Sequence, residues 1–263
     1  MEKKQALELR VALIQSSLIW ENPQQNRDNF SQKIKALTSE VDVIILPEMY
    51  TTGFTMSPEN IGIEEGEITL KWMKEIAKEN NAAIVGSIPF YENNDYTNRL
   101  FFVEPNENYH KYDKRHTFTL AGEDKVYKAG LERLIITYKG FRICPLICYD
   151  LRFPVWARNT VDYDILIYVA NWPTPRISAW NTLLKARAIE NMAYCIGVNR
   201  IGIDESGHTY PGHSGVYDTL GEKLAFSEEE NTIYATIDKD VINSTRNKLK
   251  FLNDRDEFNT LIS

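Results

Sequence analysis

The sequence lacks the residue patterns that disulfide frameworks and zinc sites require. It has three cysteines, Cys144, Cys148 and Cys195, and four histidines among 263 residues. Three cysteines cannot form a complete disulfide framework, and neither a His-x-x-x-His nor a paired Cys-x-x-Cys spacing occurs. We therefore expect no structural disulfide, no metal ion and no cofactor.

Long apolar runs and basic clusters are missing as well. No apolar stretch approaches the roughly 20 residues that span a bilayer, and residues 1–10 lack the apolar core of a secretory signal. The formal net charge is -7, and lysine and arginine form no long basic run, which argues against a nucleic-acid or anionic-membrane partner. These absences favour a cytoplasmic protein whose ligands are small metabolites.

The composition, with 43% hydrophobic and 25% charged residues, is that of an ordinary globular protein. No linker rich in glycine or serine, no low-complexity segment and no strong repeat divides the chain. We therefore expect a single domain over residues 1–263. In it, residues 248–263 form a C-terminal tail of charged and aromatic residues without clear periodicity.

Apolar runs alternate with helical patterns in both halves of the chain, which predicts β-α-β units. In the first half, we expect strands at 11–15, 41–46 and 82–87, a helix that opens at Asn22-Pro23 and a helix at 68–80. In the second half, we expect strands at 164–170 and 193–199 around a helix at 177–191. The other expected strands are 99–104, 109–112, 134–138, 141–147, 215–218 and 232–237, and a last helix begins at Asp238 and ends near Arg246.

In the segment 141–154, a predicted strand ends at a cysteine. Its apolar run ends at Cys148, and Pro154 suits the first turn of a following helix, so Cys148 is expected on a strand-to-helix turn. Backbone N–H groups and a helix N-terminus at such a turn favour the thiolate form. A lone cysteine is more often a buried structural residue, so the role of Cys148 depends on its neighbours.

Two other polar residues are predicted just beyond strand ends, Glu48 in the first half and Asn171 in the second. Open α/β sheets bind ligands beyond the carboxyl ends of their strands. Acyl transfer by cysteine needs a nucleophilic sulfur, a base for its proton and a positive charge at the developing oxyanion. Cys148, Glu48 and Lys114 have the chemistry for these three roles.

Three segments resemble, in the right order, the signature motifs of the nitrilase (carbon-nitrogen hydrolase) superfamily. They are Leu46-Pro-Glu-Met-Tyr-Thr-Thr-Gly-Phe54, Tyr112-Asp-Lys-Arg-His116 and Cys148-Tyr-Asp-Leu-Arg-Phe-Pro154. The resemblance extends from Val11 to Ile237 and includes the segments 121–130, 170–176 and 185–191. Its details are similar to the omega-amidase branch, which acts on monoamides of short dicarboxylic 2-oxo acids.

This resemblance implies an α/β fold, the four-layer α-β-β-α sandwich of the superfamily. The matching positions make Glu48 the general base, Lys114 the oxyanion stabiliser and Cys148 the nucleophile. Glu123 matches a second glutamate that orients the lysine and the substrate amide, and the backbone N–H of Tyr149 would complete the oxyanion site. Superfamily members commonly form dimers, so the resemblance also implies a homodimer or higher homo-oligomer, with the C-terminal tail at the interface.

The distal carboxylate of such a substrate needs a cation, and a guanidinium can hold a carboxylate with two hydrogen bonds. Arg152 and Arg176 are the candidates, and a structural ion pair is the alternative for each. Phe54, Phe118 and Trp172 are expected to wall the pocket, although aromatic residues are more often part of a core, and Asn171 is a further candidate for substrate contact.

The preferred function is hydrolysis of 2-oxoglutaramate or 2-oxosuccinamate to the dicarboxylate and ammonia through a thioester. The alternatives are another nitrilase-type amidase, such as an N-carbamoyl amidohydrolase, and a non-catalytic binding module on this fold. Nitrile hydrolysis is disfavoured by the residues that follow Cys148. A papain-type site with His116 as the base and Asn171 or Asn199 as its partner is also disfavoured, because the sequence around Cys148 resembles no cysteine protease.

Overall fold

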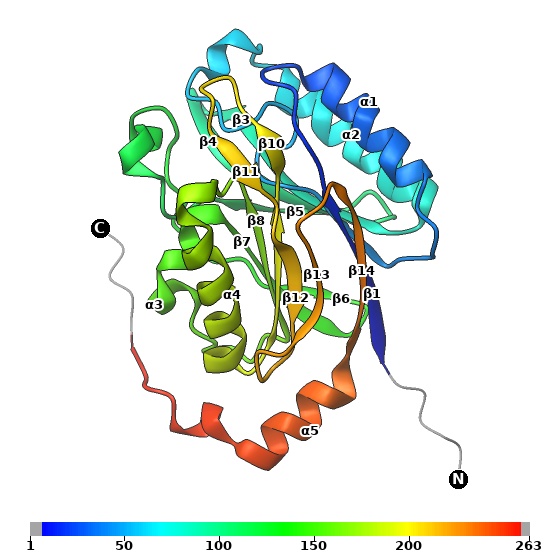
Figure 1. The fold of residues 1–263 in the computed structure, drawn as a ribbon, viewed down its shortest axis with the longest axis vertical. Helices are drawn as coiled ribbons and strands as arrows, with labels where there is room; N and C mark the ends of the chain where they lie inside the picture. Colours follow the sequence, from blue (N-terminus) through cyan, green and yellow to red (C-terminus); the bar gives the residue numbers. More distant parts are fainter. Residues whose placement is uncertain (1–6, 259–263) are drawn as a thin grey trace.

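The computed structural model describes residues 7–258, so residues 259–263 of the expected tail lie outside the described part. Two six-stranded sheets pack face to face, and helices cover the outer face of each sheet (Figure 1). The four-layer α-β-β-α sandwich that the resemblance implied is therefore confirmed.

The first sheet has the strand order β14-β1-β2-β3-β4-β5. Strands β1, β2 and β3 are parallel, and the other neighbours are antiparallel. Since β5 is antiparallel to β4, it runs in the same direction as β2, and the carboxyl ends of β2 and β5 lie at one edge. The bounds are Glu8–Gln15 (β1), Val43–Ile45 (β2), Ala83–Glu92 (β3), Asp95–Val103 (β4), Tyr109–Asp113 (β5) and Asn231–Asp238 (β14).

The second sheet has the order β13-β12-β9-β8-β7-β6, with β7, β8 and β9 parallel. The predicted hairpin between β6 and β7 turns at Lys139-Gly140, where both residues have positive φ. The bounds are Ile136–Tyr138 (β6), Phe141–Ile147 (β7), Ile165–Ala170 (β8), Tyr194–Asn199 (β9), Ser214–Tyr217 (β12) and Lys223–Ser227 (β13).

Helices α1 and α2 lie side by side over the first sheet, and α4 covers the second (Figure 1). The first of them begins as predicted, with Pro23 in its first turn and the Asn22 side chain accepting the Gln25 N–H. No helix of the described chain has the length and apolar character needed to cross a bilayer. The bounds are Pro23–Lys35 (α1), Glu65–Asn80 (α2), Pro154–Ala157 (α3), Ile177–Asn191 (α4) and Lys239–Leu249 (α5), the last extending past Arg246.

The two halves of the chain share one hydrogen-bond pattern where their parallel strands begin. The Arg10 N–H donates to the Asp42 carboxylate at 2.8 Å, and the Arg10 carbonyl accepts the Asp42 N–H at 2.8 Å. Arg142 and Asp164 repeat both bonds at 2.8 and 2.7 Å. The strands β1-β2-β3 and β7-β8-β9 are therefore built alike, as the expectation of two similar β-α-β halves required.

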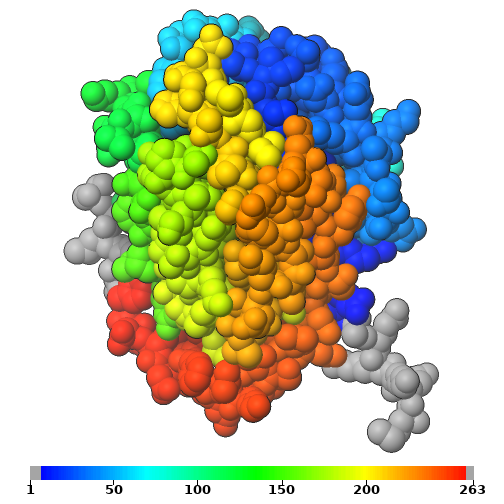
Figure 2. Space-filling view, in the orientation of Figure 1, coloured from blue at the N-terminus to red at the C-terminus, as the bar shows by residue number. Residues whose placement is uncertain are grey.

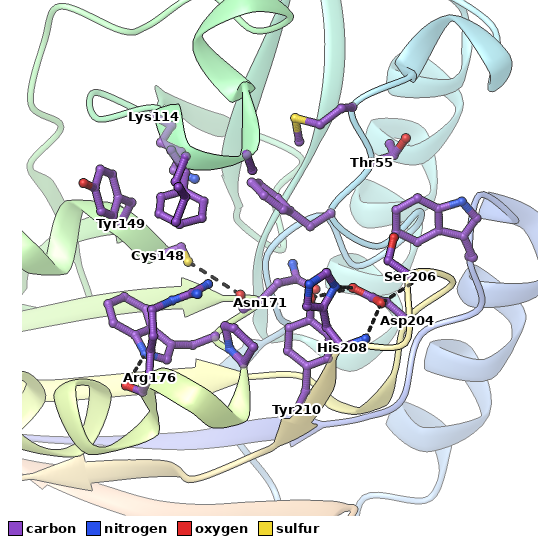
Figure 3. A pocket seen from close by; sticks show the side chains of 18 of the residues that line it. Thr55, Lys114, Cys148, Tyr149, Asn171, Arg176, Asp204, Ser206, His208 and Tyr210 are labelled. Atoms are coloured by element: carbon purple, nitrogen blue, oxygen red, sulfur yellow. Dashed lines mark hydrogen bonds and ion pairs between the residues drawn. The ribbon is translucent and has the colours of Figure 1, made fainter.

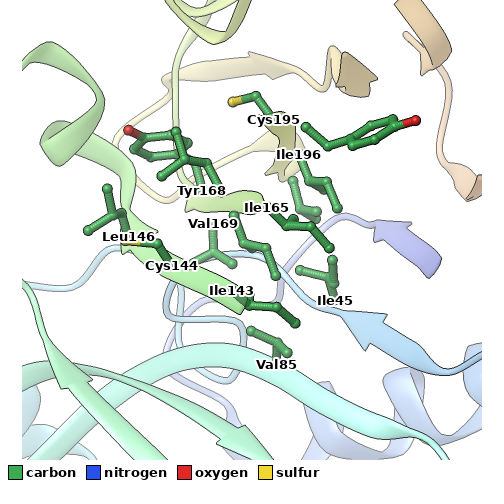
Figure 4. Close-up of a cluster of buried hydrophobic side chains, with 14 of the residues drawn as sticks. Ile45, Val85, Ile143, Cys144, Leu146, Ile165, Tyr168, Val169, Cys195 and Ile196 are labelled. Carbon is green, nitrogen blue, oxygen red and sulfur yellow. The ribbon is translucent and has the colours of Figure 1, made fainter. Parts of the chain in front are cut away.

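Apolar side chains fill the space between the two sheets. Ile45 and Val85 of the first sheet approach Ile143 and Ile165 of the second (Figure 4). Because helices cover the opposite faces, the central parallel strands are buried on both sides, which explains their continuous apolar sequences.

The sequence did not predict β13 or the hairpin formed by β10 (Ile201–Ile203) and β11 (Thr209–Pro211). The strands of this hairpin have three residues each and are partly exposed, so they carry no apolar alternation. Figure 2 shows the hairpin in yellow beside the blue N-terminal segment. Arg200 connects the two, since its Nη2 donates to the carbonyls of Leu18 at 3.3 Å and Ile203 at 3.2 Å.

Candidate active site

Strand ends from both sheets meet at one pocket (Figure 3). Glu48 follows β2, Lys114 follows β5 and Cys148 follows β7. The first two are at most 1% exposed, and Cys148 is 9% exposed. The fold thus brings together the three residues that the sequence grouped, although 66 positions separate Glu48 from Lys114.

Cys148 occupies the turn between β7 and the short 3-10 helix η4 (Cys148–Arg152). Its φ is 42°, in the left-handed region that residues with a Cβ rarely adopt. The Asp150 carboxylate accepts the Ile147 N–H at 3.0 Å and closes this turn. Pro154 begins α3 as predicted, so the placement of the thiol between a strand and a helix is confirmed.

The backbone on both sides fixes the position of Lys114. Its N–H donates to the Asn98 carbonyl at 3.0 Å, and its carbonyl accepts the Gly130 N–H at 2.9 Å. A Cβ at Gly130 would collide with the Asp113 carbonyl oxygen, so only glycine fits this close approach. The segment 121–130 of the sequence resemblance therefore packs against the chain that carries Lys114.

Two buried carboxylates share the Lys114 ammonium. Its Nζ donates to Glu48 Oε1 at 2.8 Å and to the two oxygens of Glu123 at 2.9 and 2.8 Å. Glu48 and Glu123 are both fully buried. Buried ionisable groups need hydrogen bonds and opposite charges around them, and here two carboxylates share one ammonium.

Asn171 holds Glu48 from the opposite sheet. Its backbone N–H donates to Glu48 Oε2 at 2.9 Å, and its Nδ2 donates to the Glu48 carbonyl at 2.7 Å. The Asn171 carbonyl oxygen lies 4.0 Å from the Sγ of Cys148 and accepts its weak hydrogen bond. The strand end after β8 therefore positions both the carboxylate and the thiol.

The environment of Cys148 disfavours the thiolate, contrary to the expectation from its place before a helix. Burial raises the pKa of the Cys148 thiol well above its usual range, and the Glu48 carboxylate raises it further; Lys114 opposes both effects. Burial lowers the pKa of Lys114, but Glu123 and Glu48 outweigh it and raise the pKa overall. The resting site therefore contains a neutral thiol next to a charged lysine.

A cavity of about 640 Å³ opens onto Cys148 and Lys114. All six residues predicted to bind substrate line it: Phe118, Tyr149, Arg152, Asn171, Trp172 and Arg176. Glu48 and Glu123 are not part of the lining and lie behind the lysine. Within residues 7–258, no three acidic, histidine or cysteine side chains are grouped closely enough to bind a metal ion.

The two candidate arginines face the cavity without carboxylate partners. The Arg152 guanidinium lies 5.0 Å from the centre of the Trp172 ring, and that of Arg176 lies 5.1 Å from the centre of the Phe118 ring. Neither forms an ion pair with any residue from 7 to 258. The alternative of a structural ion pair therefore finds no support in the described chain.

The β10–β11 hairpin forms a wall of the cavity that sequence reasoning missed (Figure 3). The Asp204 carboxylate at its tip accepts the Tyr210 hydroxyl at 2.8 Å and the N–H groups of Ser206 and His208 at 3.0 and 2.9 Å. A turn-forming Asp-x-Ser-Gly segment was the available signal, but it gives no indication of which surface the hairpin covers.

The His116 side chain contacts Asp150 and Phe153, and these contacts are structural. Its Nδ1 lies 2.8 Å from an Asp150 oxygen, and its ring stacks on Phe153 at 3.7 Å between centres. The other Asp150 oxygen accepts the Tyr112 hydroxyl at 2.7 Å. Because Asp150 follows Cys148 by two residues, this network ties the turn of the thiol to the segment on both sides of Lys114.

The raised pKa of Cys148 leads to a spectroscopic prediction. The difference in absorbance at about 240 nm between the wild type and Cys148→Ala should show no thiolate between about pH 7 and pH 9. Cys144→Ala is the matched control, because Cys144 is buried in β7 and does not line the cavity. A thiolate signal that titrates near neutral pH and disappears only with Cys148 would contradict the described environment.

Comparison with known proteins agrees with the geometry. Residues 10–247 match the carbon-nitrogen hydrolase family model. The omega-amidase YafV of Escherichia coli K12 is 42% identical over 252 residues, which cover 95% of this chain and 98% of that protein. The 2-oxoglutaramate amidase of Bacillus subtilis 168 is 32% identical over 234 residues, with coverage of 87% and 90%.

A solved structure is also closely similar. It is a carbon-nitrogen hydrolase superfamily protein from Xanthomonas campestris, which superposes with a TM-score of 0.93 at 38% identity and covers 96% of this chain and 99% of its own. Together with the family match, these relatives make the protein a hydrolase that acts on amide carbon-nitrogen bonds. The chain belongs to the carbon-nitrogen hydrolase family of the nitrilase superfamily, in its omega-amidase branch.

Proposed function

We propose that the protein hydrolyses the terminal amide of short dicarboxylic monoamides, with 2-oxoglutaramate and 2-oxosuccinamate as substrates, through a thioester on Cys148. The observation that carries this proposal is a cavity lined by a thiol, an ammonium and two arginines, with a buried carboxylate bonded to the ammonium. Neither arginine has a carboxylate partner among residues 7–258. The names of the omega-amidase and 2-oxoglutaramate amidase relatives support the same substrate class.

The first half-reaction forms the thioester. Glu48 accepts the Cys148 proton as the sulfur attacks the amide carbon, since a neutral thiol needs a base before it is an effective nucleophile. The electron pair of the C=O bond moves to oxygen, and Lys114 together with the Tyr149 N–H stabilises the oxyanion. When the C=O bond re-forms, the C–N bond breaks, and Glu48 gives its proton to the departing nitrogen, which leaves as ammonia.

The second half-reaction releases the acid. Water attacks the thioester carbon and transfers a proton to Glu48, and the same oxyanion donors stabilise the second tetrahedral intermediate. The C–S bond then breaks, and the proton on Glu48 returns to the Cys148 sulfur. The product is a carboxylic acid that ionises in solution, so the site is restored without a cofactor.

Glu123 serves this chemistry by fixing the lysine. It accepts hydrogen bonds from Lys114 through both oxygens and also accepts the Phe118 N–H. Donors that are already in place lose little energy to reorganisation when charge develops. Because Glu123 does not line the cavity, we assign it the positioning of Lys114 and not a contact with the reacting atoms.

The arginines give the site its preference for a dicarboxylate. A charged carboxylate at the distal end of the substrate would replace water around Arg152 and Arg176, whose guanidinium groups already lie against aromatic rings. Arg176 is half-buried and Arg152 is exposed, so solvent screens the contact with Arg176 less. We therefore expect Arg176 to contribute more to substrate binding than Arg152.

Substitutions at the reacting end test the assigned roles. Cys148→Ala should abolish ammonia release from 2-oxoglutaramate, because no thioester can form on a methyl group. Cys144→Ala, the control for loss of a buried thiol, should retain most of the activity. Turnover by Cys148→Ala at the wild-type rate would refute the mechanism.

Lys114→Met should lower kcat by about 100-fold or more, the usual effect of removing an oxyanion donor.

A substrate comparison tests the carboxylate site. In Arg152→Ala and Arg176→Ala, kcat/KM for 2-oxoglutaramate should fall by about 10- to 1,000-fold, while a neutral amide such as butyramide should be affected much less. Arg158→Ala provides a matched control, because Arg158 does not line the cavity. If both arginine variants lose activity equally on the charged and the neutral amide, the carboxylate is bound elsewhere.

A further inference from the structure

Asn98 contacts every charged member of the buried cluster, although sequence reasoning did not identify it. It lies on β4 and is fully buried. Its side-chain Nδ2 donates to Glu48 Oε1 at 2.9 Å and to Glu123 Oε1 at 3.0 Å. Its backbone carbonyl accepts the backbone N–H of Lys114 at 3.0 Å. Nδ2 of Asn98 and Nζ of Lys114 therefore bridge the same pair of carboxylate oxygens.

The Asn98 amide has only one favourable orientation. Rotating it by half a turn would place its Oδ1 against two carboxylate oxygens, and all three atoms are acceptors. In the observed orientation, the buried Oδ1 has no hydrogen-bond partner among the described residues. A buried acceptor without a donor reduces the stability of the fold. The Nδ2 of Asn98 therefore donates to both carboxylates, while its Oδ1 has no hydrogen bond among the described residues.

The balance of charge explains why the carboxylates need this donor. Two carboxylates, those of Glu48 and Glu123, share the single ammonium of Lys114, and both are fully buried. Burial raises the pKa of Glu123, the Lys114 charge opposes this and the Glu48 charge raises it further; the Asn98 hydrogen bond is among the contacts that lower it. Without Asn98, this group of residues would take up a proton more readily.

On the basis of the function proposed above, we propose that Asn98 is a positioning residue, whose Nδ2 holds the Glu48 carboxylate in the place where it accepts the Cys148 proton. Glu48 accepts the Cys148 proton only if its carboxylate is free of one. The titratable groups that face it from the surrounding elements are Lys114, Glu123 and Cys148. Asn98 does not line the cavity, so it acts on the reaction through the carboxylates.

The pH dependence of kcat/KM tests this role in Asn98→Ala and in the nearly isosteric Asn98→Leu. In both variants, the acid limb of the profile should move to higher pH by about one unit or more, since hydrogen bonds to a charged group are removed. KM should change less than kcat, and activity should recover as the pH rises. Asn159→Ala is the control: this buried asparagine bonds to Tyr163 and Asn191 outside the site, so its loss should lower Tm without moving the acid limb.

Alkylation of Cys148 by iodoacetamide, followed by mass spectrometry, gives a second readout that needs no substrate. The pH profile of the alkylation rate should show the same shift of its acid limb in both Asn98 variants. We expect this because Glu48 also accepts the thiol proton in this reaction. If 2-oxoglutaramate is not hydrolysed by the wild type but the alkylation profiles shift, the proposed substrate is wrong and the role of Asn98 stands.

Two outcomes would overturn the assignment. One is a set of pH profiles for the Asn98 variants that superimpose on the wild-type profile, whatever the absolute rate. The other is failure of both variants to fold, judged by circular dichroism. Asn98 would then be needed for folding, and its proposed role in positioning Glu48 would have no support.

Discussion

Two buried carboxylates held by one ammonium are the constraint on which the rest of this structure depends. Charges removed from water are tolerated only when hydrogen bonds and opposite charges surround them. Lys114 alone cannot supply this for Glu48 and Glu123, and Asn98 and Asn171 provide the remaining donors. Asn98 lies on a strand of the first sheet and Asn171 follows a strand of the second, so the cluster is complete only when both sheets are packed together.

The same cluster accounts for the character of the thiol. Glu48 lies beside Cys148 and disfavours its negative charge, while burial removes the water that would stabilise a thiolate. A neutral thiol with a carboxylate as its proton acceptor suits the proposed mechanism, in which one proton moves from sulfur to nitrogen and later from water to sulfur. Both glutamates favour the protonated form of Lys114, as its proposed role at the oxyanion requires.

Sequence reasoning succeeded where a local pattern determines the structure. The apolar parallel strands, the cap at Asn22 and the turn at Cys148 follow from residues that are close in the chain. It missed Asn98 because an asparagine on a strand has no distinctive local signal, and its role arises only where separate segments meet. It also misjudged the ionisation of Cys148, since the helix N-terminus is visible in the sequence and the burial beside Glu48 is not.

The acyl-enzyme is the species that tests the proposed mechanism most directly. Wild type and Glu48→Gln would be mixed with 2-oxoglutaramate, quenched in acid and analysed by peptide mass spectrometry. In the wild type, the proposed mechanism predicts a mass increase equal to the substrate minus ammonia, confined to the peptide that carries Cys148. The adduct should be absent from Cys148→Ala and should form much more slowly in Glu48→Gln, which lacks the base. Rapid ammonia release without any adduct on Cys148, or an adduct on another residue, would contradict it.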